Sequence, residues 1–188
     1  MRVLALFLVC FWGVASAADI GINRHDGMDD VIFSGEIRHG DAQLLKPFID
    51  SSVGSGRLRR FTIHGPGGNV AEAMKIGEML RGNNFSVFEP KGVSCISACI
   101  FAIMGGTHRV INGRIGLHRP LFLNIPNNIP RVQKLLLEGK QAMIEYSIRM
   151  GVSPKIIDDM YTLPNEVDIK FLSQNEISQY RLSTGGDQ

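Results

Sequence analysis

The sequence holds little that would tie it to a membrane or a nucleic acid. Its 188 residues carry 20 lysines and arginines against 18 aspartates and glutamates, a formal net charge of +2. This near-neutral balance, without a clustered basic stripe interleaved with aromatic residues, gives no reason to expect nucleic acid as a partner. No apolar run reaches the ~20 residues that a membrane-spanning helix needs. The chain also lacks an internal repeat and a low-complexity linker. What remains is an ordinary globular composition, with 44% hydrophobic and 20% charged residues, in a length that suits one domain.

The first 17 residues have the pattern of a cleavable export signal. Arg2 precedes an apolar run over 3–14, and the small residues at 15–18 form the kind of site that a signal peptidase cuts. We therefore expect cleavage after Ala17 and a periplasmic or secreted mature protein. Because the run is short, an uncleaved membrane anchor is the less favoured alternative.

Cysteine is scarce, and export decides how the few cysteines are interpreted. Cys10 leaves with the signal, so Cys95 and Cys99 are the two that stay. In an oxidising compartment such a pair tends to form a disulfide. Residues four apart on a regular helix have Cα atoms about 6 Å apart, near the outer limit of disulfide geometry, so a bond needs a departure from a straight helix. The alternative is two small buried thiols.

Strand and helix patterns alternate along the chain. Runs of β-branched residues predict strands, and apolar residues three and four apart predict helices. The strands are expected at 31–37, 60–64, 85–88, 108–111, 114–118 and 167–171, and the helices at 41–49, 69–82, 98–104, 132–150, from Pro154, and at 173–180. The Asn112-Gly113 pair predicts a hairpin between two of these strands. Alternation favours right-handed βαβ units, hence an α/β fold with a mostly parallel sheet flanked by helices.

Two predicted loops at the carboxyl ends of strands hold residues suited to acyl transfer at a serine. That chemistry needs an activated hydroxyl, a base and hydrogen-bond donors for an oxyanion. Gly67 and Gly68 can present bare backbone N–H groups. Ser97 starts a helix of small residues, whose dipole favours developing negative charge. His118 ends a strand close to Pro120, in a position suited to the base.

The order of these residues resembles that of the proteolytic subunit of Clp protease, over about residues 31–182. Five motifs carry the resemblance: Gly65-Pro66-Gly67-Gly68-Asn69-Val70 for the family's S-P-G-G-x-V loop, Ser97-Ala98 for its nucleophile, His118-Arg119-Pro120-Leu121 for H-Q-P-L, 171–182 for F-L-S-x-x-E-A-x-x-Y-G-L, and Cys95-Ile96-Ser97-Ala98-Cys99 for the C-x-S-A-C pattern of exported Clp-like proteins. The resemblance implies the Clp-protease/crotonase fold, a superhelical spiral of repeated β-β-α units. Residues 18–30 are then an N-terminal extension and 183–188 a flexible tail.

The resemblance also implies a Ser-His-Asp triad. Ser97 is then the nucleophile, His118 the base, and Gly67, Gly68 and Ala98 form the oxyanion hole. The acid should come shortly before the F-L-S motif. Asp168 is the nearest match, although it stands one residue further from that motif than the family pattern places it, and Glu166 and Asp159 are the alternatives.

Two other sites compete with the triad. His64, His108 and His118 could bind a metal, but no carboxylate or cysteine spacing supports this, so we expect no metal and no cofactor. Cys95 or Cys99 could be the nucleophile, unless the two form a disulfide, because only a free thiolate attacks. His64 also replaces a small polar residue before the glycine loop, where it would crowd the site.

The expected function is that of an exported, ATP-independent serine peptidase or related acyl hydrolase acting on peptides or proteins. The family's unfoldase partners are cytoplasmic, so an exported member should lack one. The family forms rings, and 132–150 resembles the segment that joins them, which implies a homo-oligomer; an ordinary core-covering helix is the open alternative. The alternative of a different class is a non-catalytic binding or scaffold protein with the same fold. Acyl-CoA chemistry on the related crotonase fold is disfavoured because CoA esters are cytoplasmic.

Overall fold

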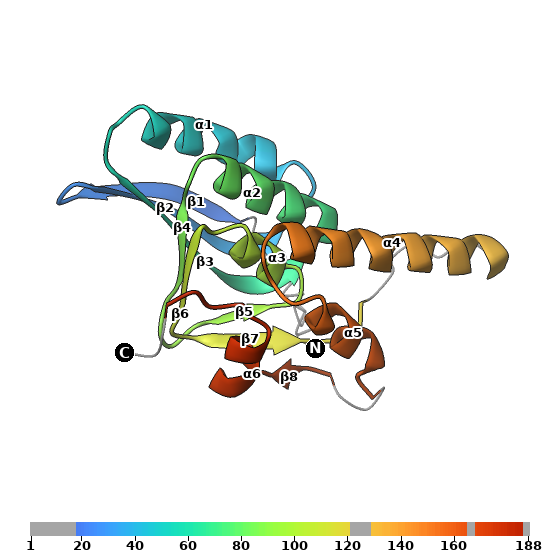
Figure 1. Cartoon of the computed structure of the whole chain (residues 1–188). Helices are drawn as coiled ribbons and strands as arrows, with labels where there is room; N and C mark the ends of the chain where they lie inside the picture. Colours follow the sequence, from blue (N-terminus) through green and yellow to red (C-terminus); the bar gives the residue numbers. More distant parts are fainter. Residues whose placement is uncertain (1–17, 121–128, 165–167, 186–188) are drawn as a thin grey trace, which may run out of the picture.

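The computed structural model describes residues 18–120, 129–164 and 168–185. The expected signal, with its cleavage point after Ala17, lies outside these residues. The elements in chain order are β1 (Asp19–His25), β2 (Met28–Ile37), α1 (Asp41–Val53), β3 (Leu58–Gly68), α2 (Val70–Gly82), β4 (Ser86–Glu89), β5 (Ser94–Ile96), α3 (Cys99–Met104), β6 (His108–Ile111), β7 (Arg114–Leu117), α4 (Ile129–Arg149), α5 (Lys155–Thr162), β8 (Lys170–Phe171) and α6 (Gln174–Gln179) (Figure 1).

The strands form a mostly parallel sheet that branches at β3. The first part of β3 pairs in parallel with β2 and β4, and β4 pairs with β6. Further along, at Gly65, β3 pairs instead with β5, which is parallel to β7. Two pairs are antiparallel, β1 with β2 and β7 with β8. The predicted α/β class and the mostly parallel sheet are therefore confirmed.

Helices α1 and α2 lie side by side over one face of the sheet, and α3 lies beneath α2 (Figure 1). All six residues of α3 are buried. A Cβ on Gly105, just after α3, would collide with the backbone of Gly77 in α2, so these helices approach closely enough to exclude a side chain. From the other side, the buried Tyr146 of α4 donates a hydrogen bond to the carbonyl of Phe101 at 2.7 Å. The helix that carries the Ser97 turn is thus enclosed by apolar packing.

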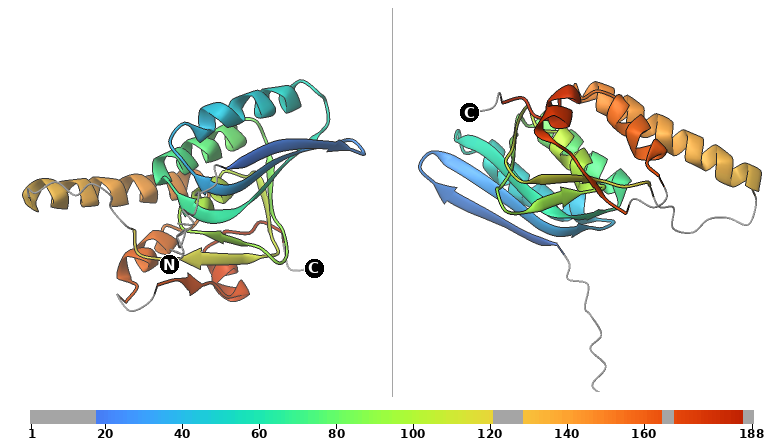
Figure 2. Two further views of the ribbon diagram at one scale, coloured as in Figure 1. Left: turned by 180° about the vertical axis from the view of Figure 1, so that it is seen from behind. Right: turned by 90° about the horizontal axis from the view of Figure 1, so that it is seen from below.

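The N-terminal half of α4 extends away from the rest of the described structure (Figures 1 and 2). Its exposed side chains include Leu135 and Leu137, with exposed fractions of 47% and 70%. Towards its C-terminus the same helix turns Met143 and Tyr146 into the core. Among the described residues, none of the helices has the length and apolar character that a membrane crossing requires.

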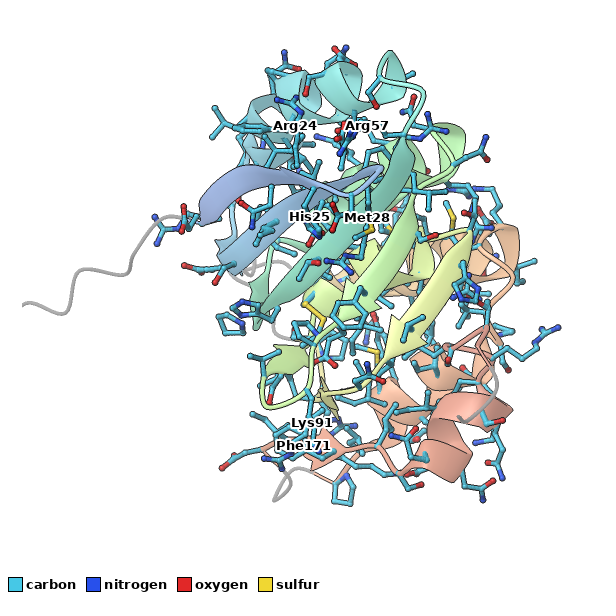
Figure 3. The ribbon with its side chains drawn as sticks, turned by 90° about the vertical axis from the view of Figure 1, so that its left-hand side faces the viewer. Arg24, His25, Met28, Arg57, Lys91 and Phe171 are labelled. Atoms are coloured by element: carbon cyan, nitrogen blue, oxygen red, sulfur yellow. A yellow bond between two sulfur atoms is a disulfide. The ribbon has the colours of Figure 1, made fainter. Side chains whose placement is uncertain are left out.

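The segment 18–30 is not an extension outside the domain, as the sequence suggested, but part of the sheet. β1 pairs along its whole length with β2, from Asp19 opposite Ser34 to His25 opposite Met28 at the turn. Arg24 and Arg57 lie close together at this end of the hairpin (Figure 3), where both approach the buried carboxylate of Asp29, at 3.8 and 2.7 Å. Their charges offset the cost of burying that carboxylate.

The C-terminal segment expected as a flexible tail is also held, as far as it is described. The Thr184 amide donates to the carbonyl of Arg109 at 3.0 Å, and the Thr184 hydroxyl accepts from the Arg109 amide at 2.7 Å. The buried guanidinium of Arg109 donates to the carbonyls of Leu182 and Arg181 at 2.8 and 3.0 Å. These long-range bonds, invisible in the sequence, fasten the chain end to β6.

Two local predictions were wrong. Asn112-Gly113 does not close a hairpin, because β6 pairs with β4 while β7 pairs with β5 and β8, so the chain passes between the two branches there. The carboxylate of Glu89 accepts a hydrogen bond from the Gly113 amide at 2.5 Å and holds this corner. The Gly65–Gly68 segment is not a free loop but the end of β3, with Gly67 and Gly68 opposite Glu36 and Ile37 after a register shift.

Candidate active site

Three neighbouring parallel strands bring the predicted site residues to one edge of the sheet. Gly65 of β3 pairs with Cys95 of β5, and Ile96 of β5 pairs with Gly116 of β7. Parallel strands share a direction, so the segments that follow these pairs leave the sheet at the same carboxyl edge. Each predicted site residue lies two residues beyond a paired position: Gly67 after Gly65, Ser97 after Cys95, and His118 after Gly116. The register therefore brings all three to this edge, although Ser97 follows β5, a strand that the sequence analysis did not predict.

Ser97 stands at a sharp turn from strand to helix. β5 ends at Ile96 and α3 begins at Cys99, and Ser97 adopts φ 57°. This left-handed conformation costs a non-glycine residue about 1–2 kcal/mol. Its amide donates to the Gly116 carbonyl at 2.9 Å, and its carbonyl accepts from the Ile100 amide at 3.1 Å. Strained residues of this kind persist where the surroundings over-determine them, which is common at active sites.

Gly67 lies against this turn. A Cβ on it would stand 2.6 Å from the Ile96 carbonyl oxygen, 2.7 Å from Ser97 Cβ and 2.9 Å from the Ala98 nitrogen. Its φ of 101° is also unfavourable for residues with a side chain. Gly68, at φ 128°, instead packs against the backbone of Ile37. Only glycine fits at position 67, and the absent side chain leaves backbone polar groups beside Ser97.

The Ala98 amide is the described donor best suited to an oxyanion. Ala98 is fully buried and precedes α3, in helical conformation. Within the three described ranges, its N–H donates to no backbone carbonyl, as is usual for the first N–H groups of a helix. It is adjacent to Ser97 in the chain and borders Gly67 in space. A donor in this position can stabilise negative charge that forms next to the Ser97 hydroxyl.

His118 leaves β7 with its ring half-buried. Its Nδ1 is 2.5 Å from the carbonyl oxygen of Arg119. A carbonyl only accepts, so this contact puts the proton of the neutral ring on Nδ1 and leaves Nε2 as an acceptor. The Arg119 guanidinium in turn donates to the Tyr161 carbonyl at 2.8 Å, which ties this segment to α5. Among the described residues, no hydrogen bond joins His118 to the Ser97 hydroxyl, so that pairing stays a prediction.

The triad acid is not joined to His118 in the structure. Asp168 is exposed, and the antiparallel register that sets Lys170 opposite Leu117 would, if continued, bring Asp168 beside Arg119. Within the part of the chain that the structure covers, its carboxylate has no hydrogen bond or ion pair. Glu166, one of the alternatives, lies outside the described residues.

Asp159, the other alternative, has different partners. Its carboxylate accepts hydrogen bonds from the Lys155 ammonium at 2.6 Å and from the Tyr180 hydroxyl at 2.5 Å. Burial raises the pKa of Asp159, but these two hydrogen bonds and the charges of Lys155 and Lys170 together lower the pKa below its ordinary value. Asp159 lines a hollow beside α5 and α6 that includes neither Ser97 nor His118. Of the two described candidates, Asp168 therefore keeps the better position.

Cys95 and Cys99 form a disulfide, with their Cα atoms 5.4 Å apart. The departure from a regular helix that such a bond requires is the turn at Ser97, between them. With both sulfurs bonded and both side chains at most 1% exposed, neither cysteine offers a thiolate. A cysteine nucleophile is therefore excluded in this form of the protein.

No family model and no curated protein matches this chain. The likeness to Clp protease therefore stays a hypothesis from the sequence motifs. The chemistry has to be argued from the residues themselves.

A metal site made of the three histidines does not fit their placement. His108 starts β6, whereas His118 follows β7, so the two lie at opposite ends of parallel strands. The His108 ring is 3.1 Å from the hydroxyl of Thr184. His64 lies on β3 opposite Ser34. Among the residues described, no three His, Cys, Asp or Glu side chains form a group that could hold a metal ion.

Sequence reasoning missed Gly116. Its carbonyl holds the Ser97 amide, and a Cβ on it would press on Ile169 and Ile96, at 2.9 and 3.0 Å. An isolated glycine inside a strand indicates such a close approach and could have been noticed. Next to it on β8, Phe171 (Figure 3) stacks its ring on the Arg114 guanidinium, 3.5 Å from the ring centroid.

Glu89 was also missed, and no sequence signal points to it. It is fully buried, and burial raises its pKa to about 7, although hydrogen bonds from the Gly113 and Arg114 amides oppose the shift. Glu89 thus fixes the start of β7, the strand that ends at His118. Its carboxylate supports the site from a distance.

Proposed function

We propose that the protein is an exported, ATP-independent serine peptidase or related acyl hydrolase with Ser97 as its nucleophile. The observation that carries the proposal is the contact between Gly67 and the turn at Ser97. There a serine in left-handed conformation, a bare glycine backbone and the Ala98 amide, which donates to no backbone carbonyl of the described residues, meet at one sheet edge. A buried core serine would need none of these features. Together they supply a nucleophile and an oxyanion donor in adjacent positions.

The proposed reaction is an acyl transfer in two steps. The Ser97 hydroxyl oxygen attacks the substrate carbonyl carbon while its proton passes to Nε2 of His118. The negative charge that develops on the carbonyl oxygen is stabilised by the N–H of Ala98 and by the backbone N–H groups of Gly67 and Gly68. His118 then returns the proton to the leaving group. A water molecule attacks the acyl-enzyme in the same way and regenerates Ser97.

In this mechanism Nδ1 of His118 keeps its proton. In the structure the Arg119 carbonyl oxygen lies within hydrogen-bond distance of Nδ1. The proposed acid is Asp168, which the continued register of β7 and β8 would bring beside Arg119, next to His118 in the chain. Apo active sites often tighten their hydrogen bonds only when substrate binds, so an open Ser97–His118 pair is compatible with this role.

Other features of the structure support the proposed superfamily, compartment and oligomeric state. The parallel crossovers β3–α2–β4 and β5–α3–β6 are compatible with the spiral of repeated β-β-α units in the Clp-protease/crotonase superfamily. A disulfide fits an oxidising compartment, outside the reach of a cytoplasmic unfoldase. The protruding half of α4, with its exposed leucines, suits contacts between subunits of a homo-oligomer. Peptides or proteins are the proposed substrates.

One observation favours a second function. Because Ser97 and His118 are not hydrogen-bonded and the described acids do not reach His118, the fold could serve as a non-catalytic binding or scaffold protein. In that case the strained turn at Ser97 would be a relic of lost chemistry.

Labelling with a fluorophosphonate probe, followed by peptide mass spectrometry, separates the two functions. We expect the purified mature protein to be modified at Ser97 and the Ser97→Ala variant to stay unmodified. Ser94→Ala is the matched control, because Ser94 lies on the same strand, and it should label as the wild type does. Absence of labelling in a folded wild type would support the scaffold function, and equal labelling of Ser97→Ala would refute the nucleophile.

A further inference from the structure

The disulfide spans the proposed nucleophile, Ser97, and one of the proposed oxyanion donors, Ala98. It joins Cys95, within β5, to Cys99, the first residue of α3. Ser97 and Ala98 are therefore members of the small covalent ring that the bond closes. Cys95 is anchored in the sheet by its pairing with Gly65 and Ile115, on the strands that carry the rest of the site. A covalent link thus connects the sheet directly to the start of the helix across the nucleophile.

The ring restricts what the chain can do at Ser97. In an extended strand, residues four apart have Cα atoms about 13 Å apart, whereas a disulfide requires at most about 7 Å. The observed distance is 5.4 Å, so the chain must reverse within the ring. The reversal falls on Ser97, at φ 57°. Extended conformations of this turn are excluded for as long as the bond exists.

Without the bond, noncovalent contacts would maintain the turn, among them the packing of Gly67 against it. The Ser97 amide keeps its hydrogen bond to Gly116, and its carbonyl keeps that from Ile100. Neither hydrogen bond closes the chain covalently, so both restrict the turn less than the ring does. A strained conformation relaxes once its surroundings cease to over-determine it. Relaxation would rotate the Ser97 side chain and the Ala98 N–H with respect to each other.

We propose that Cys95 and Cys99 are positioning residues, whose disulfide holds the Ser97 hydroxyl and the Ala98 N–H in the arrangement needed for acyl transfer. The inference rests on the proposed function. It makes the site dependent on the oxidised state. A dithiol such as dithiothreitol reverses that state: its thiolates displace one sulfur after the other, the S–S bond breaks, two protein thiols form, and the dithiol becomes a cyclic disulfide. Because both cysteines are buried, this exchange should be slow in the folded protein.

The test compares the oxidised wild type, the wild type reduced until mass spectrometry shows two free thiols, and the Cys95→Ala/Cys99→Ala variant. Fluorophosphonate labelling is measured at temperatures where thermal unfolding shows every form to be folded. We expect the maximal labelling rate to fall by about tenfold or more in both disulfide-free forms, with a smaller change in probe affinity, because small displacements of reacting groups cost large factors in rate. Reoxidation should restore the reduced wild type, which keeps its full core volume.

Two controls separate positioning from stability. Dithiothreitol should leave the labelling of the double variant unchanged. Val152→Ala, which removes methyl groups from a fully buried position away from the turn, should lower the melting temperature but label at the wild-type rate. Equal rates in the oxidised and reduced wild type would overturn the proposal while leaving the proposed function intact.

If the oxidised wild type does not label, the proposed function fails, and the position of the turn is still measurable. The ¹³Cα and ¹³Cβ chemical shifts of Ser97 report the sign of φ, and the Ala98 amide reports its own surroundings. Positioning predicts left-handed shifts in the oxidised protein that are lost on reduction, with little change in β6 or α5. Shifts that stay the same in both states would overturn it.

Discussion

Replacing Gly67 with alanine would insert a methyl group into the tightest contact of the candidate site. The new Cβ would meet the Ile96 carbonyl oxygen at 2.6 Å, Ser97 Cβ at 2.7 Å and the Ala98 nitrogen at 2.9 Å. Real Cβ atoms do not approach other atoms so closely. Backbone forms two of these three contacts, so the strand and the Ser97 turn must separate.

The expected cost has two parts. An alanine at φ 101° pays about 1–2 kcal/mol for its left-handed backbone. Forcing an extra carbon into a packed region costs about 1–3 kcal/mol more. Gly67→Ala should therefore lower the free energy of unfolding by about 2–5 kcal/mol, the sum of both. Gly92→Ala is the matched control, because Gly92 has φ 87° and nothing within 4 Å of its added Cβ. That variant should lose only the stability that the left-handed backbone costs, about 1–2 kcal/mol.

Urea denaturation gives the free energies, and fluorophosphonate labelling of the folded protein gives the effect on the site. A displacement of about 1 Å can cost a factor of about 100 in rate, so Gly67→Ala should label about 100 times more slowly. Gly92→Ala should label within about twofold of the wild type, since its backbone cost alone does not reach the site. If both variants lost stability and labelling equally, the contact with Ser97 would not be the reason for glycine at position 67.

Three further results are expected. Because the pKa of Glu89 is raised from 4.5 to about 7, the folded protein keeps a proton that the unfolded chain releases between these pH values. The free energy of unfolding, measured with urea, should therefore fall by on the order of 3 kcal/mol from pH 4.5 to 7, and an equal fall in Glu89→Gln would contradict this. Ser97→Gly should be about 0.5–1 kcal/mol more stable than Ser97→Ala, since glycine relieves the left-handed strain at some entropic cost, and identical urea midpoints would argue against strain. Asp168→Asn should slow labelling by about 100-fold or more while Asp159→Asn leaves it near the wild-type rate, and the reverse result would reassign the acid.

Most helices and strands were predicted from local patterns, but β1 and the short β5 were not. Helices α1 and α2 follow from apolar periodicity and from the Asn69 cap, whose side chain accepts from the Glu72 amide at 2.9 Å. The corner at Asn112-Gly113 could not be predicted in this way, because pairing of β6 with β4 depends on a strand some twenty residues earlier. Local turn chemistry indicated a hairpin, and the buried carboxylate of Glu89 overrode it.

The identities of the site residues came from the sequence. A glycine pair near a strand end, a serine between two cysteines and a histidine at a strand end are local features that the sequence shows. Their elements were predicted less well, because the glycine pair lies within β3 and Ser97 follows the unpredicted β5. Their chemistry is a property of residue type, so order and spacing suffice to select Ser97 and His118 as candidates.

Only the tertiary structure decided how these residues meet. The register of β3, β5 and β7 sets Gly67 against Ser97, and the reversal at Ser97 allows Cys95 and Cys99 to bond. Neither can be read from the chain alone, because contacts between distant strands and the sign of one φ angle arise from packing. Packing likewise gave Asp159 its partners Lys155 and Tyr180 and left Asp168 exposed.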